Sequence, residues 1–94
     1  MVQIIWIEKA INDLNEIAEF IAKNSPKYAD LTIDTIFEKT QILKDYPEIG
    51  RIVPEVNKSN IRELIEGNYR IIYEIVNENL VEILTIHHSS RFLK

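Results

Sequence analysis

Residues 60–91 read NIRELIEGNYRIIYEIVNENLVEILTIHHSSR, and this stretch decides the fold. It contains three short runs rich in β-branched and aromatic residues, separated by Glu66-Gly67-Asn68 and by Asn77-Glu78-Asn79. Such runs favour strands, and short polar loops between them favour tight turns that join antiparallel neighbours. The stretch therefore predicts a three-stranded antiparallel meander.

The residues before the meander predict one strand and two helices. Residues 2–7 are apolar and β-prone with poor alternation, which predicts a strand buried on both faces. From Glu8 to Ile21 the apolar residues recur at helical spacing, and a second such stripe runs from about Pro26 to Asp45. Because Ser25-Pro26 is a typical N-cap and first-turn pair, we expect the two helices to form an antiparallel hairpin.

The predicted fold class is α+β, in one domain that spans residues 1–94. The order is an N-terminal strand, the helical hairpin and then the meander, with both helices packed on one face of a small antiparallel sheet. Pro47 ends the second helix, Gly50 permits a bend, and residues 53–59 form a surface connection.

Composition narrows the classes of function. The chain has no cysteine, no export signal and no apolar run of membrane-spanning length, so we expect a cytoplasmic protein that uses no disulfide and no membrane. The net charge of −4 is unlike that of a protein that binds nucleic acid through many phosphates. Any site for a polyanion must therefore concentrate its cations in one place.

Four segments stand in a characteristic order: residues 46–51 (YPEIGR), 61–64 (IREL), 67–73 (GNYRIIY) and 83–91 (ILTIHHSSR). With the helical hairpin ahead of them, they resemble the RelE/ParE superfamily of toxin–antitoxin toxins over essentially the whole chain. The resemblance implies the toxin of a plasmid-stabilisation type of system, encoded beside an antitoxin.

The superfamily divides by activity. RelE-like members cleave messenger RNA in the ribosomal A site, whereas ParE-like members poison DNA gyrase. The proline–glycine turn after a long second helix resembles the ParE-like branch more closely. The implied partners are a cognate antitoxin and either DNA gyrase or the ribosome with its messenger RNA; a relative that only binds protein is a third possibility. Neither a glycine-rich phosphate loop nor zinc-ligand spacing is present, so we expect no cofactor and no metal.

Arg70 is the first candidate for catalysis if the chain is a nuclease. Metal-free RNA cleavage needs a base, an acid and fixed cations for the charge on the phosphorane. Arg70 matches the arginine that contacts the scissile phosphate in the nuclease branch. Strand alternation predicts that it faces away from the helices, on the open side of the sheet and opposite to Tyr69 and Tyr73. The alternative is an ion pair with Glu63 or Glu82 across the sheet.

Arg62, His87 and Arg91 complete the candidate catalytic set. Arg62 resembles a basic residue of the preceding strand, although Glu63 stands where a further cation would be useful. His87 and His88 point to opposite faces of a strand, so at most one joins Arg70, as acid or base or as a half-exposed polar residue. Arg91 either assists Arg70 or is a solvated terminal charge.

Three apolar residues lie off the helical stripes. Phe20 is off the first stripe, and Leu31 and Ile42 lie on the far side of the second helix from its core face. They are either singly exposed apolar residues or a partner-binding patch on the outer surface of the hairpin that the antitoxin covers.

Overall fold

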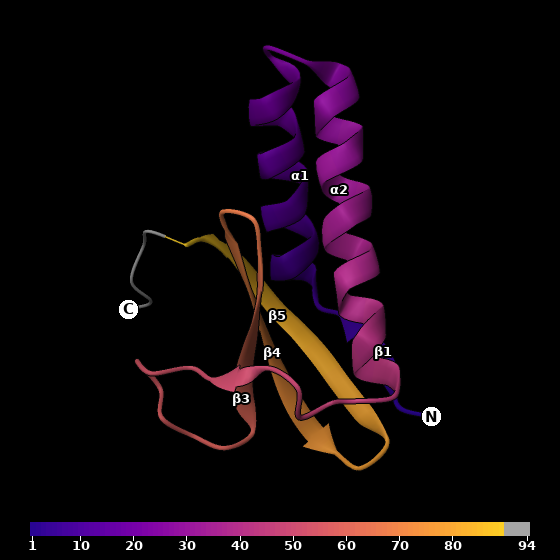
Figure 1. Cartoon of the computed structure of the whole chain (residues 1–94), viewed down its shortest axis with the longest axis vertical. Coiled ribbons are helices and arrows are strands. Elements are labelled where there is room, and N and C mark those ends of the chain that lie inside the picture. The colour runs from indigo at the N-terminus through magenta and orange to yellow at the C-terminus, as the bar shows by residue number, and fades with distance from the viewer. Residues whose placement is uncertain (90–94) are drawn as a thin grey trace.

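A computed structural model describes residues 1–89 as a helical hairpin beside a five-stranded sheet (Figure 1). The elements, in chain order, are β1 (Gln3–Trp6), α1 (Glu8–Ala22), α2 (Pro26–Gln41), the 3-10 turn η1 (Ile42–Lys44), β2 (Arg51–Ile52), β3 (Ile61–Glu66), β4 (Tyr69–Asn77) and β5 (Leu80–His88). The predicted α+β class is confirmed, with the helices on one face of the sheet.

The strand order is β1-β5-β4-β3-β2. β3, β4 and β5 form the predicted antiparallel meander. The expectation of a wholly antiparallel sheet is wrong, because β1 pairs parallel with β5 at the edge of the sheet. Most of the chain separates these two strands, so no tight turn imposes an antiparallel pairing.

Two details of the strands also differ from expectation. β1 is not buried on both faces: it lies at an edge, and Gln3 and Ile5 are exposed while Ile4 and Trp6 are partly covered. β2 is an additional two-residue strand in the segment predicted as a turn, and its Arg51 lies opposite Glu63. A pairing this short leaves no periodicity that a sequence can display.

The helix boundaries follow the predicted signals. The Ser25 hydroxyl accepts a hydrogen bond from the Tyr28 N–H at 3.1 Å, and Pro26 opens α2. η1 extends the second helix to Lys44, one residue short of the predicted end. Neither helix in residues 1–89 has the length and apolarity needed to cross a bilayer.

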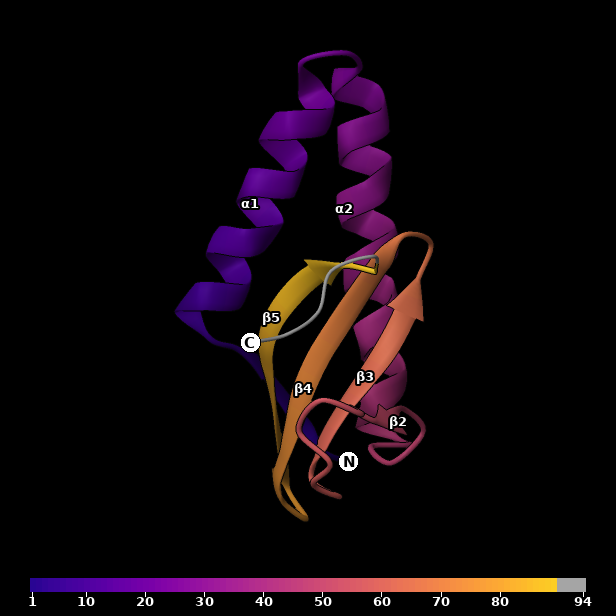
Figure 2. The same cartoon turned by 90° about the vertical axis from the view of Figure 1, so that its left-hand side faces the viewer.

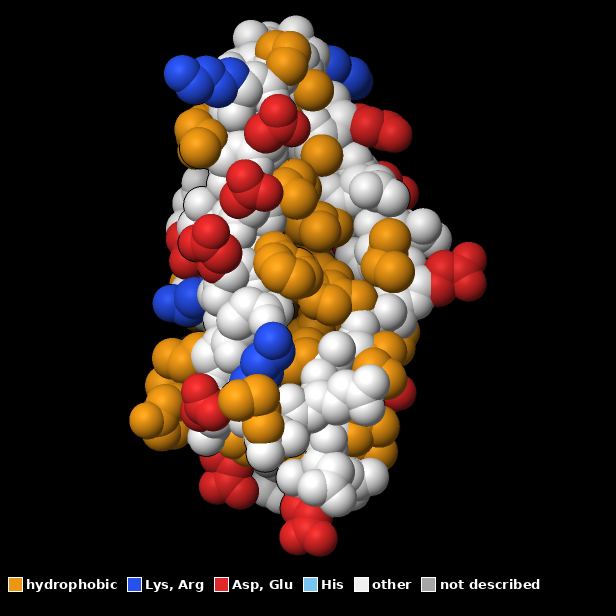
Figure 3. All heavy atoms as spheres, turned by 90° about the vertical axis from the view of Figure 1, so that its right-hand side faces the viewer, with side chains coloured by type: hydrophobic (Ala, Val, Ile, Leu, Met, Phe, Trp, Pro, Cys, Tyr) orange, Lys and Arg blue, Asp and Glu red, His pale blue; other side chains and the backbone are white. Residues whose placement is uncertain are grey.

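The core lies between the hairpin and one face of the sheet. Its fully covered members come from α1, α2, η1 and the three meander strands: Ala10, Ile36, Leu43, Leu64, Ile71, Tyr73, Val81, Ile83 and Ile86. Two residues of the predicted stripes, Ile11 and Phe37, are instead about half exposed. Figure 3 shows apolar side chains gathered along the seam between the helices, on the face away from the sheet.

The hairpin is longer than the part of the sheet that it covers. Figure 1 shows its tip, around residues 22–26, projecting beyond the ends of the strands. The apolar stripe therefore continues past the core into a region where α1 and α2 overhang the β3–β4 turn.

Asp13 of α1 accepts hydrogen bonds along part of the edge of the sheet. β1 ends opposite Ile83, and beyond that point the Asp13 carboxylate accepts hydrogen bonds from the Ile86 N–H at 3.1 Å and from the Thr85 hydroxyl. An extra residue in β5, Leu84, forms a β-bulge here. Burial alone would raise the pKa of Asp13, but the hydrogen bonds from Thr85 and Ile86 outweigh it and lower the pKa below its usual 3.8.

We expect Asp13→Asn to lower the free energy of unfolding by about 1 kcal/mol at pH 7, because charge-assisted hydrogen bonds become neutral ones. A carboxylate whose pKa is lowered by folding stabilises above its unfolded pKa and loses that contribution as the pH falls through the folded value. Urea unfolding should therefore show a deficit that vanishes in acid below pH 3.8. Glu16→Gln, an exposed change of equal charge on the same helix, is the control; a deficit independent of pH would contradict the expectation.

Candidate partner surface and arginine cluster

The face of the sheet away from the helices is covered as well. Ile71 and Tyr73 of β4 point into the core, so Arg70 and Ile72 point to the opposite side. Both are nonetheless buried, with 5% and 3% of their surface exposed. Arg70 lies on the predicted face, but the expectation that this face is open is wrong.

The connection from β2 to β3, residues 53–60, reaches over this face and ends beside the lower parts of β3 and β4 (Figure 2). Its Glu55 carboxylate accepts hydrogen bonds from the two terminal nitrogens of Arg70, at 2.7 and 2.9 Å. The loop thus brings an anion to the guanidinium and helps to cover it. The sequence does not predict this contact, because nothing in the spacing of Glu55 and Arg70 indicates it.

Within residues 1–89, the ion pairs of Arg70 and Glu63 join two cations, Arg51 and Arg70, to two anions, Glu55 and Glu63. Its Nε donates to Glu63 Oε1 at 2.6 Å, and the other oxygen of Glu63 accepts a hydrogen bond from Arg51. The alternative pairing of Arg70 with Glu63 is therefore the one found. The hydrogen bonds to Glu55 raise the pKa of Arg70 above its already high value; burial opposes this shift and Glu63 adds to it.

Arg62 lies on the other face of the sheet and does not join this cluster. It is opposite Tyr73 in the register, and Tyr73 faces the helices. Its guanidinium donates to three backbone carbonyls, those of Ser59, Glu48 and Gly50, at 2.9, 3.2 and 3.0 Å. Arg62 thus ties two loops together. The predicted grouping of Arg62 with Arg70 is wrong, because Arg70 pairs with Ile65, three residues from Arg62, and an odd spacing along a strand places side chains on opposite faces.

The segment from Pro47 to Gly50 is fixed by Tyr73. The Tyr73 hydroxyl donates to the Pro47 carbonyl at 2.7 Å and accepts from the Gly50 N–H at 3.0 Å. A Cβ at Gly50 would come within 2.6 Å of that hydroxyl and of the Glu63 carbonyl, so only glycine fits. Burial raises the pKa of Tyr73 above its usual value and keeps it neutral. The part of the YPEIGR segment from Pro47 to Gly50 is therefore held in place by its contacts with Tyr73.

The histidines diverge as alternation predicts. His87 lies opposite Arg70, whereas His88 lies opposite Tyr69 and makes an edge contact with its ring at 5.9 Å. Arg91, the remaining catalytic candidate, lies outside the described residues. Over residues 1–89, no group of three or more histidine or carboxylate side chains is placed to hold a metal ion.

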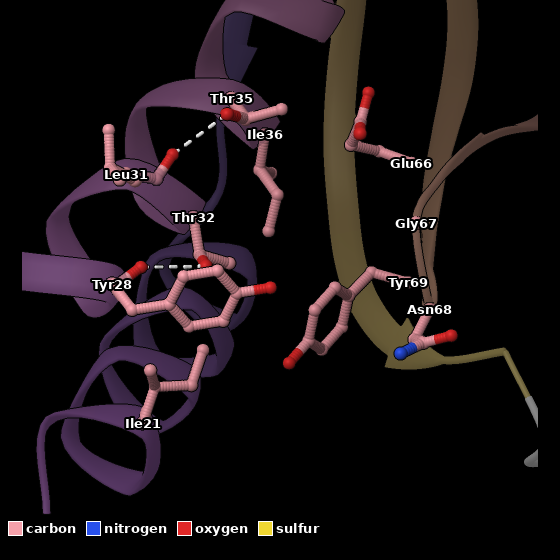
Figure 4. Close-up of a pocket in the computed structure, with 10 residues that line it drawn as sticks. All are labelled: Ile21, Tyr28, Leu31, Thr32, Thr35, Ile36, Glu66, Gly67, Asn68 and Tyr69. Atoms are coloured by element: carbon pink, nitrogen blue, oxygen red, sulfur yellow. Dashed lines mark hydrogen bonds between the residues drawn. The ribbon is translucent and has the colours of Figure 1, made fainter. Parts of the chain in front are cut away.

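Two hollows flank Tyr69 where the hairpin overhangs the sheet. The first is a cleft of about 260 Å³ between α2 and the β3–β4 turn, with Tyr28 facing Tyr69 across it and Leu31 at its border (Figure 4). The second, of about 370 Å³, lies between α1 and the end of β5, and Phe20 and His88 contribute to its walls. Both hollows combine apolar side chains with a polar rim, which is typical of a protein-binding surface.

The three residues predicted to bind a partner are exposed but do not form one patch. Phe20, Leu31 and Ile42 are 69%, 54% and 39% exposed. Leu31 and Phe20 contribute to the two hollows beside Tyr69, while Ile42 lines a third hollow against β2 and β3. The three residues therefore border different hollows instead of one continuous patch, and their role in partner binding stays a prediction.

A family model described as the ParE toxin of type II toxin–antitoxin system, parDE, matches residues 4–92. The chain is 31% identical over 91 residues to Toxin RelE2 of Caulobacter vibrioides, covering 97% of this chain and 99% of that protein. It is 36% identical over 86 residues to Putative toxin Y4kP of Sinorhizobium fredii, covering 89% and 84%.

Solved structures agree with this fold. A chain of the chromosomal ParDE system from P. aeruginosa superposes with a TM-score of 0.76 at 23% identity, covering 94% of this chain and 96% of that one. A chain of the RelBE2 toxin–antitoxin complex from Mycobacterium tuberculosis gives 0.58 at 19% identity, covering 93% and 96%. The fold is that of the RelE/ParE superfamily of toxins. Because the family match spans almost the whole chain, this protein belongs to the ParE toxin family of type II toxin–antitoxin systems.

We expect Glu63→Gln to lower the free energy of unfolding by about 3 kcal/mol, because a buried ion cluster that loses one charge leaves the others uncompensated. The Glu63 side chain has no exposed surface and bridges Arg51 and Arg70. Glu78→Gln, in the exposed β4–β5 turn, removes the same charge and should change stability by less than about 0.5 kcal/mol. Equal chemical denaturation midpoints for the two variants would contradict the importance of the cluster.

Proposed function

We propose that this chain inhibits growth by contacting DNA gyrase in the cytoplasm, without cutting RNA, and that a cognate antitoxin neutralises it. The proposal rests on the burial and ion pairing of the Arg70 side chain. In the superfamily resemblance this residue corresponds to the phosphate-binding arginine of the nuclease branch, and here it is buried against two carboxylates.

A second candidate cation, Arg62, supports the same reading. A nuclease of this kind needs several fixed positive groups that converge on one phosphate. Arg62 is engaged by three backbone carbonyls on the opposite face of the sheet from Arg70. Action through protein contact needs no such convergence, and it is consistent with the net charge of −4.

The two hollows beside Tyr69 are the proposed antitoxin surface. An amphipathic helix that lies under the overhanging hairpin would bury Leu31, Tyr28 and Phe20 with its apolar face. Its polar face would meet the charged rim, which includes Lys9, Glu16 and Glu66. The neighbours from P. aeruginosa and M. tuberculosis are described as toxin–antitoxin assemblies, which supports a partner of this class by analogy.

We expect the purified chain to inhibit DNA supercoiling by gyrase while leaving ribosome-bound messenger RNA intact. Expression without the antitoxin should stop growth, and co-expression of the neighbouring open reading frame should restore it. The supercoiling assay and transcript mapping at A-site codons are to be run in parallel on one preparation.

Two other outcomes would replace this function. Cleavage in the A site that falls about a hundredfold in Arg70→Ala would identify a RelE-like ribosome-dependent endoribonuclease. Harmless expression, with neither gyrase inhibition nor cleavage, would identify a protein-binding relative that has lost toxicity. The 31% identity to Toxin RelE2 makes transcript mapping an essential arm of the experiment.

We expect Leu31→Lys to weaken antitoxin binding at least about tenfold, because a charge in the centre of an apolar contact must be desolvated. Val76→Lys is the matched control: Val76 is 42% exposed near the far end of β4 and should retain wild-type affinity. Titration calorimetry with the antitoxin measures both. Unchanged affinity in Leu31→Lys, with the fold intact by circular dichroism, would exclude the cleft.

A further inference from the structure

The face of the hairpin away from the sheet carries an apolar seam between α1 and α2 (Figure 3). Ile11 of α1 and Phe37 of α2 are 45% and 49% exposed, and Ile33 lies one helical turn before Phe37. The Phe37 ring stacks on Trp6 of β1, with 6.3 Å between the ring centroids. Ile11, Ile33 and Phe37 are not members of the apolar core. The seam is therefore a surface on which further apolar side chains can be buried.

The seam and the hollows beside Tyr69 lie on different sides of the hairpin. A helix turns by about 100° per residue, so Ile33 lies roughly 160° around α2 from Leu31. On α1, Ile11 lies roughly 180° from Phe20. Because Leu31 and Phe20 contribute to the two hollows, a partner that fills the hollows leaves the seam uncovered.

Carboxylates border the seam. Asp30, Asp34 and Glu38 recur every four residues along α2 and are all exposed, and Figure 3 shows acidic side chains beside the apolar ones. Within residues 1–89 these three carboxylates form no ion pair. Like charges four residues apart on a helix repel each other. Cations of a partner that approach this border would relieve the repulsion.

The charge of the hairpin decides which kind of partner fits. The two helices carry seven acidic residues against three lysines. A second copy of this chain on the seam would bring two acidic borders together, and like charges facing each other across an interface weaken it. A helix with an apolar stripe and basic flanks would instead pack between α1 and α2 and place its cations beside the carboxylates.

We propose that the seam is a second protein-binding surface, and that its partner is an amphipathic helix whose apolar stripe is flanked by lysine or arginine. This surface is separate from the hollows assigned to the antitoxin, so it stays available in the toxin–antitoxin complex. The proposal goes beyond the proposed function and does not depend on the cellular target.

The test uses two synthetic peptides of about 16 residues, which as helices match α2 in length. Both carry leucines at helical spacing, flanked by lysine in one peptide and by glutamate in the other, with a fluorescent label for anisotropy. We expect the lysine-flanked peptide to bind at least about tenfold more tightly at low salt. The complex obtained by co-expression with the antitoxin should bind that peptide with the affinity of the free chain.

Variants of the seam locate the contact. Phe37→Ala should weaken binding of the lysine-flanked peptide at least about tenfold, whereas Val76→Ala, on a strand far from the seam, should retain wild-type affinity. The double variant Asp30→Lys, Asp34→Lys changes only exposed positions and should reverse the preference, so that the glutamate-flanked peptide binds more tightly. This reversal keeps the test decisive if Phe37→Ala does not fold.

Trp6 reports directly on the seam. It is the only tryptophan of the chain, and its buried indole N–H belongs to the ring that stacks on Phe37. We expect the indole N–H NMR signal of the wild type to shift as the lysine-flanked peptide binds. Binding without this shift would place the peptide elsewhere and overturn the inference.

Three further results would also overturn the inference. Equal affinities for the two peptides would reveal apolar adhesion without charge selection. Loss of binding in the antitoxin complex would mean that the antitoxin itself covers the seam. Dimerisation of the free chain in analytical ultracentrifugation, abolished by Phe37→Ala, would assign the seam to a second copy.

Discussion

The Glu63 carboxylate is charged and buried, and the arrangement of the helix-free face of the sheet depends on it. Each of its oxygens accepts a hydrogen bond from a different arginine, Arg51 of β2 and Arg70 of β4. Burying a charge is costly unless it is paired and hydrogen-bonded. The need to compensate this charge therefore holds β2, β4 and the loop that carries Glu55 in one relative position.

The two faces of the sheet are stabilised by different kinds of interaction. The face under the hairpin is a conventional apolar core, to which side chains from both helices and the meander contribute. The opposite face lacks helices in the described part of the chain and is covered instead by a loop and a charged cluster. The first face tolerates changes that conserve volume, whereas the second depends on the number and direction of its charges.

Arg70 lies on the charged face, and its partners there include carboxylates of this chain. A guanidinium on the helix-free face is available to a phosphate only when the chain itself does not supply the anion. Glu55 and Glu63 supply it here, and Arg62 is used as a tie between loops on the other face. The hollows beside Tyr69 arise separately, because the hairpin is longer than the sheet it covers. The hollows and the arginine cluster therefore occupy different parts of the molecule.

The amino-acid sequence alone determined the element types, because helical and strand periodicities and the Ser25-Pro26 cap are local properties. It also determined that Arg70 faces away from the helices, since alternation along a strand fixes the side of the sheet. Only the tertiary structure decided that β1 pairs parallel with β5, that Glu55 reaches Arg70, and that Tyr28 and Tyr69 face each other across a cleft. Those outcomes depend on contacts between residues far apart in the chain. Local spacing does not indicate which distant residues the folded chain brings together.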